Sequence, residues 1–301
     1  MTAGRKKIDI SVCIATFRRP KKLRRLLKSL EIAIKNVEAR VEIIVVDNDA
    51  ACSAKESVAH ISNQMQNLHY FSEPVQNISL ARNRALAQAE GHWIAFVDDD
   101  EIVEPNWLRA YWTYQKTHAA DGYFGPVLPR MEEKSPLWFD AELLFHRPRF
   151  ETGTRLFDKM RTGNAFIQAD VFTNERFNPK YGLSGGGDAI YFALRANENR
   201  VFLWNDAAIT YEIYPKERMK LSWLMQRYFR AGLNYSAFRL QQKHNRMLIL
   251  TKAVVVLLFF SFTLIFRFFQ SPAKGVLQFL RMCMQIGHLA ACFNVVYYEY
   301  K

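Results

Sequence analysis

Short apolar runs alternate with amphipathic stretches along the first hundred residues. The apolar runs are Ile8–Ala15, Val41–Val46, Leu68–Phe71 and Trp93–Val97. Their length and β-rich composition predict buried strands. Between the first two, Lys21–Ile34 has leucines at helical spacing and basic residues on the other face, which predicts an amphipathic helix. We expect two more helices, over Ser53–Gln66 and after Asn77.

The resulting order β-α-β-α-β-α-β predicts an α/β fold with a mostly parallel sheet flanked by helices. Neither GxGxxG nor GxxxxGK[ST] occurs, so we expect neither a dinucleotide fingerprint nor a P-loop. The middle of the chain is less regular, and Arg130–Arg149 reads as an aromatic-rich loop. Further strand candidates are Gly122–Pro129, Thr162–Ile167, Arg200–Trp204 and Ala208–Glu212.

Polar residues recur where the predicted strands end. They are Thr16 and Arg18, then Asp47 and Asn48, then Asp98, Asp99 and Asp100. The carboxyl ends of parallel strands share one edge of a sheet, which is where open α/β sheets bind ligands. We therefore expect these side chains on one rim.

The strand ending at Val97 runs directly into four acids, Asp98 to Glu101. Adjacent carboxylates repel one another, and a divalent cation would remove that cost. Mg²⁺ or Mn²⁺ prefers such hard oxygen ligands. The alternative is a solvated acidic turn ahead of a helix that Pro105 begins.

Three consecutive glycines, Gly185 to Gly187, precede Asp188 and a helical pattern over Ala189–Arg195. Such a run marks a close approach or an unusual turn. Asp188 would then lie near a helix N-terminus, where aspartate is a good cap. A capping role and a catalytic role are compatible, because the helix end keeps a carboxylate ionised.

The stretch from Pro215 to Arg239 is basic and aromatic and includes Arg227 and Arg230. It fits a nucleic-acid surface, a solvated helix face, or phosphate clamping beside an anionic membrane. We favour the third interpretation because two apolar segments follow, Met247–Phe269 and Val276–Tyr298.

The charge-free part of the first apolar segment, Ala253–Phe266, is 14 residues long. A span needs about 20 residues. A hairpin dipping into one leaflet, two spans and two buried soluble helices all remain open. Basic residues precede the segment, so the flanking domain should be cytoplasmic.

The totals are consistent with this outline. The chain has 301 residues and a formal charge of +12, from 41 Lys and Arg against 29 Asp and Glu. Such an excess suits nucleic acid, an anionic membrane or phosphate-bearing substrates. Its four scattered cysteines predict neither a disulfide framework nor a zinc site. The polar start, residues 1–7, does not read as a secretory signal.

With these residues in view, the chain resembles the family 2 glycosyltransferases, inverting enzymes of the GT-A fold, over roughly residues 8–235. The resemblance rests on motifs in the family's order. They are Ser11–Pro20, Ile43–Asn48, Leu80–Ala85, Phe96–Glu101 with its DxD, Gly186–Asp188, and Glu212–Arg218 with Trp223, Arg227, Arg230 and Gly232. The last resembles the closing segment of bacterial exopolysaccharide and lipopolysaccharide members.

The sequence departs from the family pattern in two ways. Family members often have Glu-Asp where this chain has Gly187-Asp188, so only Asp188 inherits the catalytic-base role. The QxxRW motif of processive synthases is also missing, which favours addition of a single sugar over polymerisation.

The resemblance implies a metal-dependent, inverting hexosyltransferase. The donor would be a nucleoside-diphosphate sugar, UDP-linked, and the acceptor a lipid-linked saccharide at the cytoplasmic face of the bacterial inner membrane. Asp98 and Asp100 would hold Mg²⁺ or Mn²⁺. Donor contacts would come from Thr16, Arg18, Asp47, Asn48, Arg82, Asn83, Asp98, Asp99, Arg227 and Arg230.

We expect residues 1–120 to form the nucleotide-sugar half, 121–240 the acceptor and catalytic half, and 241–301 a membrane-associated helical segment. Two other functions are compatible with the sequence. One is a membrane-associated sugar-nucleotide-binding subunit without catalysis, and the other is a basic nucleic-acid-binding protein. The favoured reading expects no nucleic acid.

Overall fold

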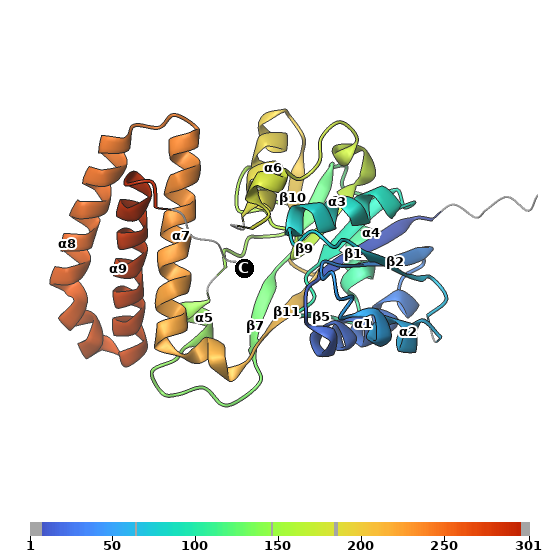
Figure 1. The fold of residues 1–301 in the computed structure, drawn as a ribbon, viewed down its shortest axis with the longest axis horizontal. Helices are drawn as coiled ribbons and strands as arrows, with labels where there is room; N and C mark the ends of the chain where they lie inside the picture. The colour runs from blue at the N-terminus through green and yellow to red at the C-terminus, as the bar shows by residue number, and fades with distance from the viewer. Residues whose placement is uncertain (1–7, 64, 146, 184–185, 296–301) are drawn as a thin grey trace, which may run out of the picture. The chain divides into compact units, whose positions relative to one another are not determined.

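The computed structural model describes residues 8–295 except 64, 146 and 184–185 (Figure 1). The polar start over residues 1–7, Gly185 and the end of the second apolar segment, 296–298, lie outside the described residues. Two compact units are present. Unit 1 contains the residues up to Leu128 and from Arg147 to Glu212, and unit 2 contains those from Pro129 to 145 and from Ile213 onward.

The predicted alternation of strands and helices is confirmed in unit 1. Its strands are β1 Ile10–Thr16, β2 Val41–Asp47, β3 Leu68–Ser72, β4 Trp93–Val97, β5 Glu101–Val103, β6 Gly122–Phe124, β8 Arg155–Leu156, β9 Asn164–Gln168 and β10 Phe202–Trp204. Its helices are α1 Pro20–Lys35, α2 Lys55–Ser62, α3 Ile78–Gln88, α4 Trp107–Gln115 and α6 Gly187–Asn197, with short 3-10 turns at Ala169–Phe172 and Pro179–Tyr181.

The main sheet has eight strands in the order β3-β2-β1-β4-β9-β6-β10-β8. The first four are mutually parallel, as predicted. β9 runs antiparallel to both of its neighbours, and β8 runs antiparallel to β10, so the sheet is mixed beyond β4.

Helices cover both faces of this sheet (Figure 1). Along β1, Ile10, Val12 and Ile14 point to one face and Cys13 to the other, as a two-residue period requires. The first face packs against α1, α2 and α4, and the second against α3 and α6. The buried leucines predicted in Lys21–Ile34 are the contacts that α1 makes with this core.

Two strands pass from one unit to the other. They are β7, Val127–Met131, and β11, Thr210–Tyr214, which form a second sheet in the order β5-β11-β7. β5 and β11 are antiparallel, with Glu101 opposite Glu212. Gly122–Pro129, expected as one strand with turns, therefore contains β6 and the start of β7.

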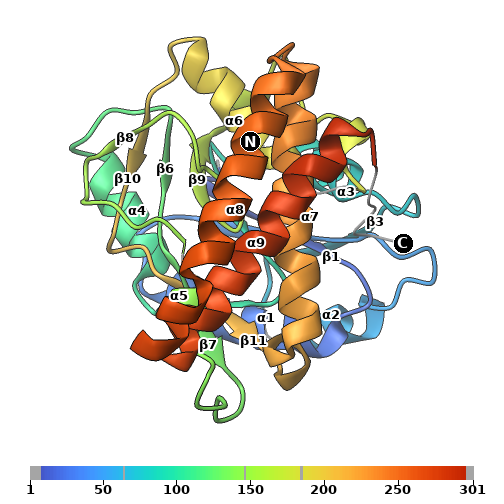
Figure 2. The ribbon, with the colours of Figure 1, turned by 90° about the vertical axis from the view of Figure 1, so that its left-hand side faces the viewer.

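Unit 2 is mainly helical. It contains α5 Ala141–Leu144, α7 Leu221–Gln241, α8 Arg246–Gln270 and α9 Pro272–Cys292, with a 3-10 turn at Lys216–Met219. α9 packs along both α7 and α8 (Figure 2). Within the described residues, α8 is the one helix long and apolar enough, by length and composition, to cross a membrane.

Candidate active site

The predicted rim is present in unit 1. β2, β1 and β4 are adjacent and parallel, so their carboxyl ends lie side by side. Thr16 pairs with Asp47 at the ends of β1 and β2. On the other side, the Thr16 hydroxyl donates a hydrogen bond to Asp99 at 2.7 Å.

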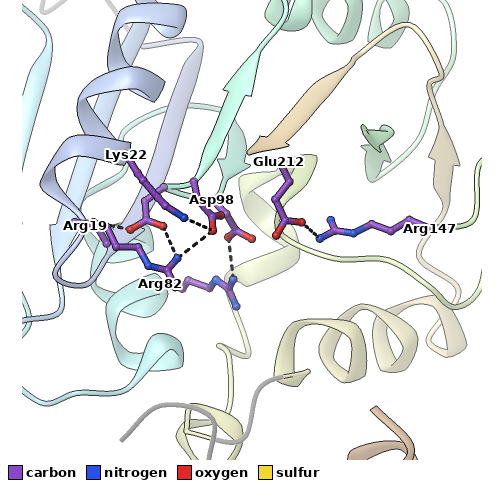
Figure 3. Close-up of polar contacts among 9 residues, drawn as sticks. Arg19, Lys22, Arg82, Asp98, Arg147 and Glu212 are labelled. Atoms are coloured by element: carbon purple, nitrogen blue, oxygen red, sulfur yellow. Dashed lines mark hydrogen bonds and ion pairs between the residues drawn. The ribbon is translucent and has the colours of Figure 1, made fainter. Parts of the chain in front are cut away.

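Two cations from the start of α1 lie against the acid run (Figure 3). Arg19 donates to Asp99 at 3.1 Å and to Asp100 at 3.2 Å, and the Lys22 ammonium lies 3.5 Å from Asp100. Proline at the first helical position begins α1 directly after Arg19. Neither cation was predicted as part of the site, although both follow β1, the strand that neighbours β4.

A third cation comes from α3. Asn77 caps this helix by accepting hydrogen bonds from the backbone N–H groups of Ser79 and Leu80. One turn further on, an Arg82 nitrogen lies 3.3 Å from an Asp98 carboxylate oxygen (Figure 3). The Asp98 side chain remains 45% exposed, so this carboxylate is open to an incoming ligand.

Negative charge is in excess along the acid run. Although part of its side chain reaches solvent, Asp98 is crowded by protein atoms, and this partial desolvation raises its pKa. The charges of Asp100 and Asp188 add to that rise, against the lowering effect of Arg82. Burial also raises the pKa of Asp99 to about 6, although Arg19 acts in the opposite direction. The pKa of Glu101 is raised well above its ordinary value, first by burial and then by the charge of Asp98.

Glu101 belongs to a second, buried group of charges. Its Oε2 atom has no hydrogen-bond partner among the described residues. It lies opposite Glu212, which is ion-paired with Arg147 (Figure 3). Like charges directly opposite one another destabilise an antiparallel pair, and Arg147 offsets part of that cost. Neither Arg147 nor Glu212 was predicted as part of a site.

Asp188 is held at the start of α6. One of its carboxylate oxygens accepts hydrogen bonds from the Thr162 backbone N–H at 3.0 Å and the Thr162 hydroxyl at 2.9 Å. Burial raises the pKa of Asp188, but the charges of Arg82 and Arg161 and the Thr162 hydrogen bonds outweigh it and lower the pKa below its ordinary value. The carboxylate is therefore ionised at neutral pH.

The neighbouring glycines explain the absence of a second acid. Gly186 has a φ of +77°, a conformation that side chains rarely adopt. A Cβ at Gly187 would lie 2.8 Å from the Cβ of Tyr181. The chain as folded thus has no room for the glutamate that family members often carry beside this aspartate.

The structure brings Asp188 and Asp98 together. Thr162 bonds Asp188, and a Cβ on the next residue, Gly163, would lie 3.2 Å from an Asp98 oxygen and 2.8 Å from Glu101 Oε1. The charge of Arg82 acts on both aspartates. A single dipeptide and a shared arginine therefore link the candidate base to the acid run.

Other predicted donor contacts are engaged within their own chain. Asp47 is fully buried and accepts hydrogen bonds from Ala54, Tyr70 and Asp49. Asn48 bonds the backbones of residues 73, 75 and 77, and Asn83 bonds both backbone groups of Phe177. Their contacts with a donor stay predictions.

The predicted arginines differ in their surroundings. Arg18 has a positive φ of 54° and a side chain that is 67% exposed, with its guanidinium 3.3 Å from Asp49. Arg227 and Arg230 lie on α7 in unit 2, where the Arg227 guanidinium stacks over the rings of Phe145 and Trp223. Their donor contacts also stay predictions.

Within the described residues, no group of three or more His, Cys, Asp and Glu side chains is arranged to hold a metal ion. Mg²⁺ commonly takes only one or two carboxylates when substrate phosphates supply other ligands. The partly exposed carboxylate of Asp98 fits such an arrangement. Asp100 is paired with Arg19 and Lys22, and its part in a metal site stays a prediction.

Comparison with known proteins decides the family. Residues 11–174 match the model of glycosyl transferase family 2. The chain belongs to this family. This glycosyltransferase is 33% identical over 245 residues to the succinoglycan biosynthesis protein ExoM of Rhizobium meliloti (strain 1021), covering 79% of this chain and 76% of that protein. The predicted resemblance to bacterial polysaccharide members of family 2 is thereby confirmed.

Solved structures confirm the GT-A type of fold. The glycosyltransferase superposes on S. aureus TarS 1–349 in complex with UDP-GlcNAc with a TM-score of 0.55 and 18% identity, over 74% of this chain and 66% of that one. It also matches the mannosyltransferase PcManGT of Pyrobaculum calidifontis in complex with GDP-Man and Mn²⁺, with a TM-score of 0.57, 12% identity, and coverage of 96% and 75%. At these identities the likeness shows the fold alone.

Proposed function

We propose that this glycosyltransferase moves one sugar from a nucleoside-diphosphate sugar to a hydroxyl of a lipid-linked saccharide in bacterial cell-surface polysaccharide synthesis. The observation that carries the proposal is the placement of Asp188 and Asp98 on either side of the Thr162–Gly163 peptide. Three relatives bear on the finer assignments. ExoM is named for succinoglycan biosynthesis, and TarS was solved with UDP-GlcNAc. PcManGT was solved with GDP-Man, so the UDP-linked donor rests on the family resemblance and is the part that a donor panel has to test.

In this mechanism Asp188 is the general base. It takes the proton of the acceptor hydroxyl, whose oxygen attacks the anomeric carbon as the bond to the diphosphate breaks, so the configuration inverts. Thr162 fixes the carboxylate through one of its oxygens, which orients the other toward the acceptor. The lowered pKa of Asp188 keeps it in the basic form.

Asp98 and Asp100 would hold Mg²⁺ or Mn²⁺, which, when bound, would stabilise charge on the departing diphosphate. The raised pKa values of Asp98 and Asp99 and the unpartnered Glu101 oxygen support this assignment, because they indicate a local deficit of positive charge. Arg82 adds a fixed positive charge beside Asp98, where it would attract the donor phosphates.

The acceptor assignment rests on unit 2. Its apolar helix α8 and the basic residues around it suit an enzyme working at the cytoplasmic face of the bacterial inner membrane. A lipid-linked saccharide would be presented at that surface.

A panel of nucleoside-diphosphate sugars tests the donor directly. We expect one UDP-linked sugar to raise the melting temperature in the presence of Mn²⁺, and EDTA to remove the shift, because the two carboxylates need the phosphates to complete a metal site. The same donor should then label a lipid extract from bacterial membranes. An unchanged transfer rate in excess chelator would remove Asp100 from the mechanism, and the absence of any stabilising donor would contradict the proposal.

A further inference from the structure

α8 exposes a continuous apolar stripe. Val255, Leu258, Phe262, Ile265 and Phe269 recur at alternating spacings of three and four residues, which places them on one face of a helix. All five are exposed, and Phe262 and Phe269 are 87% and 86% exposed. Monomeric soluble proteins rarely leave so long a patch in water, so this face has a partner.

The charges of α8 lie away from this stripe. At about 100° per residue, Lys252 falls beside the stripe and Arg267 falls on the opposite side of the helix. From Arg218 to Tyr298 the chain has eleven Lys and Arg residues and no Asp or Glu. This part of the chain is strongly positive, so two copies of it would repel one another, whereas anionic lipid headgroups would attract it.

The packing of unit 2 argues against a span. α9 follows α8 after a single residue, Ser271, and packs back along it. α9 is in turn locked to α7, because a Cβ at Gly232 would overlap the Met284 carbonyl oxygen and a Cβ at Gly287 would overlap that of Phe229. A crossing α8 would therefore carry the whole bundle into the bilayer.

That insertion would be costly. α7 contributes Arg227, Arg230 and Arg239, and a charged side chain at the bilayer centre costs several kcal/mol. The charge-free part of α8 also measures only about 21 Å, against a hydrocarbon thickness of about 30 Å.

Two hydroxyl groups in the middle of α8 donate hydrogen bonds to the backbone of the same helix, which suits a helix that faces lipid. The hydroxyls of Ser261 and Thr263 donate to the carbonyl oxygens of Leu257 and Phe259. Gln278 of α9 donates to Thr263 at 2.6 Å from the inward side. The hydroxyls of Ser261 and Thr263 are therefore already paired when this part of the helix enters an apolar medium.

We propose that α8 lies in the plane of an anionic membrane, with its apolar stripe in the acyl boundary, and that the α8–α9 hairpin does not cross the bilayer. Such interfacial helices sink about 5–10 Å into the headgroup region. This assignment refines the membrane location proposed above and is independent of the donor, the acceptor and Asp188.

Vesicle binding by the full chain tests the stripe. Leu258→Asp should weaken partitioning onto phosphatidylcholine vesicles containing phosphatidylglycerol by at least about tenfold. The reason is that a leucine lying among the lipid acyl chains is replaced by a charge. The matched control is Leu137→Asp, an equally drastic change at an exposed leucine of unit 2 outside α8, which should bind as the unchanged protein does. Equal binding by Leu258→Asp would overturn the proposal, as would loss of binding by both variants.

A second measurement addresses the alternative partner, another copy of the chain. In sedimentation experiments without lipid, the unchanged protein and Leu258→Asp should have the same oligomeric state. A dimer that Leu258→Asp converts to monomer would identify the stripe as a dimer seam and refute the lipid assignment.

Topology is read by labelling in cells. Gln270→Cys, next to the hairpin turn, is placed in a background lacking the four native cysteines, and Asp158→Cys in unit 1 serves as the reference. A membrane-impermeant maleimide should label both positions in inverted vesicles and neither in intact spheroplasts. Labelling of Gln270→Cys from the periplasmic side alone would show a span. Sugar transfer from the donor is measured on the same cysteine variants. Because it reports the proposed function and the labelling reports topology, a failure of one can be told from a failure of the other.

Discussion

Unit 1 and the helices of unit 2 differ most in how they carry charged side chains. At the sheet edge of unit 1, three of four consecutive acids, Asp98 to Asp100, are paired with Arg19, Lys22 and Arg82. From Arg218 to Tyr298 the chain has eleven Lys and Arg residues and no acid, and its helix α8 exposes an apolar stripe. Ion pairs with acids fix a reacting geometry, whereas a segment with basic residues and no acids keeps a net positive charge that attracts an anionic surface. The two regions should therefore fail in different ways.

The largest expected effect falls on the acid edge of unit 1. Asp188→Asn keeps the size and the Thr162 contact of the side chain but removes the proton acceptor. Turnover should fall by about 10²–10⁴-fold, the usual cost of losing a general base, while nucleotide still binds. Single-turnover transfer and nucleotide titration measure the two quantities separately.

Asp170→Asn is the matched control for that substitution. Asp170 is an exposed aspartate of unit 1 whose ion pair with Arg200 is far from the acid run in sequence. It should retain transfer. Full activity in Asp188→Asn would end the assignment of this residue as base, and lost nucleotide binding would show that it acts on the donor instead.

A smaller effect is expected from Gly232→Ala, which acts on unit 2. The new methyl would overlap the Met284 carbonyl oxygen, so α7 and α9 would have to separate. Overpacking of this kind costs about 1–3 kcal/mol. Hydrogen exchange should quicken in α7 and α9, with the nucleotide affinity of unit 1 unchanged.

The neighbouring Ala231→Ser adds one atom on the exposed side of α7 and serves as the control for Gly232→Ala. It should leave hydrogen exchange as it was. If Gly232→Ala lost nucleotide binding as well as the protection of α7 from hydrogen exchange, the two units would unfold together. Their stabilities would then not be independent.

The smallest effect concerns a charge pair of unit 1 outside the site. The hydrogen bonds from Arg149, at 2.7 and 2.8 Å, lower the pKa of Asp206, with a further contribution from Trp204. A lowered folded-state pKa stabilises the fold above the unfolded pKa, and this contribution is lost as the pH falls through the folded value.

Asp206→Asn should therefore lower stability near neutral pH by about 1 kcal/mol or less, since the pair is partly exposed. The decline of the urea midpoint between about pH 6 and about pH 3 should become shallower. Asp158→Asn, at an exposed loop position, provides the baseline. A steeper acid decline in Asp206→Asn would show that the sign of this linkage is wrong.

The sequence predicted the first four strands of unit 1 because their apolar runs and the leucine spacing of α1 are local signals. It did not predict the reversal of β9, since strand direction depends on how the chain connects rather than on composition. β5 was hidden because it begins within the acid run, at Glu101. The helix expected from Pro105 begins at Trp107.

In the segment Arg130–Arg149, too, contacts between residues distant in sequence could not be predicted from local patterns. It was interpreted as an aromatic-rich loop, yet Phe139 and Phe145 are buried there. Phe145 stacks on Tyr214 with ring centroids 4.0 Å apart. Such a partner, distant in sequence, leaves no periodic signal near residue 145.

The acids of the site were predictable because each follows a strand end. Their cations were not, because Arg19 and Asp99 are 80 positions apart and only the sheet order joins them. Thr162 and Gly163 stood out in the sequence as part of a strand candidate, and no contact of theirs with the acids was predicted. Their role as the link between Asp98 and Asp188 required the observed path of the chain.

The way the chain passes between its two units has a consequence for synthesis on the ribosome. Residues 129–145 belong with those from Ile213 onward, so the side chains of Phe139, Leu144 and Phe145 wait for Tyr214, Leu224 and Leu280 to emerge. Tyr214 follows Phe145 by 69 residues and Leu280 follows it by 135. These apolar side chains of the nascent polypeptide therefore stay in contact with water until α9 has left the ribosome.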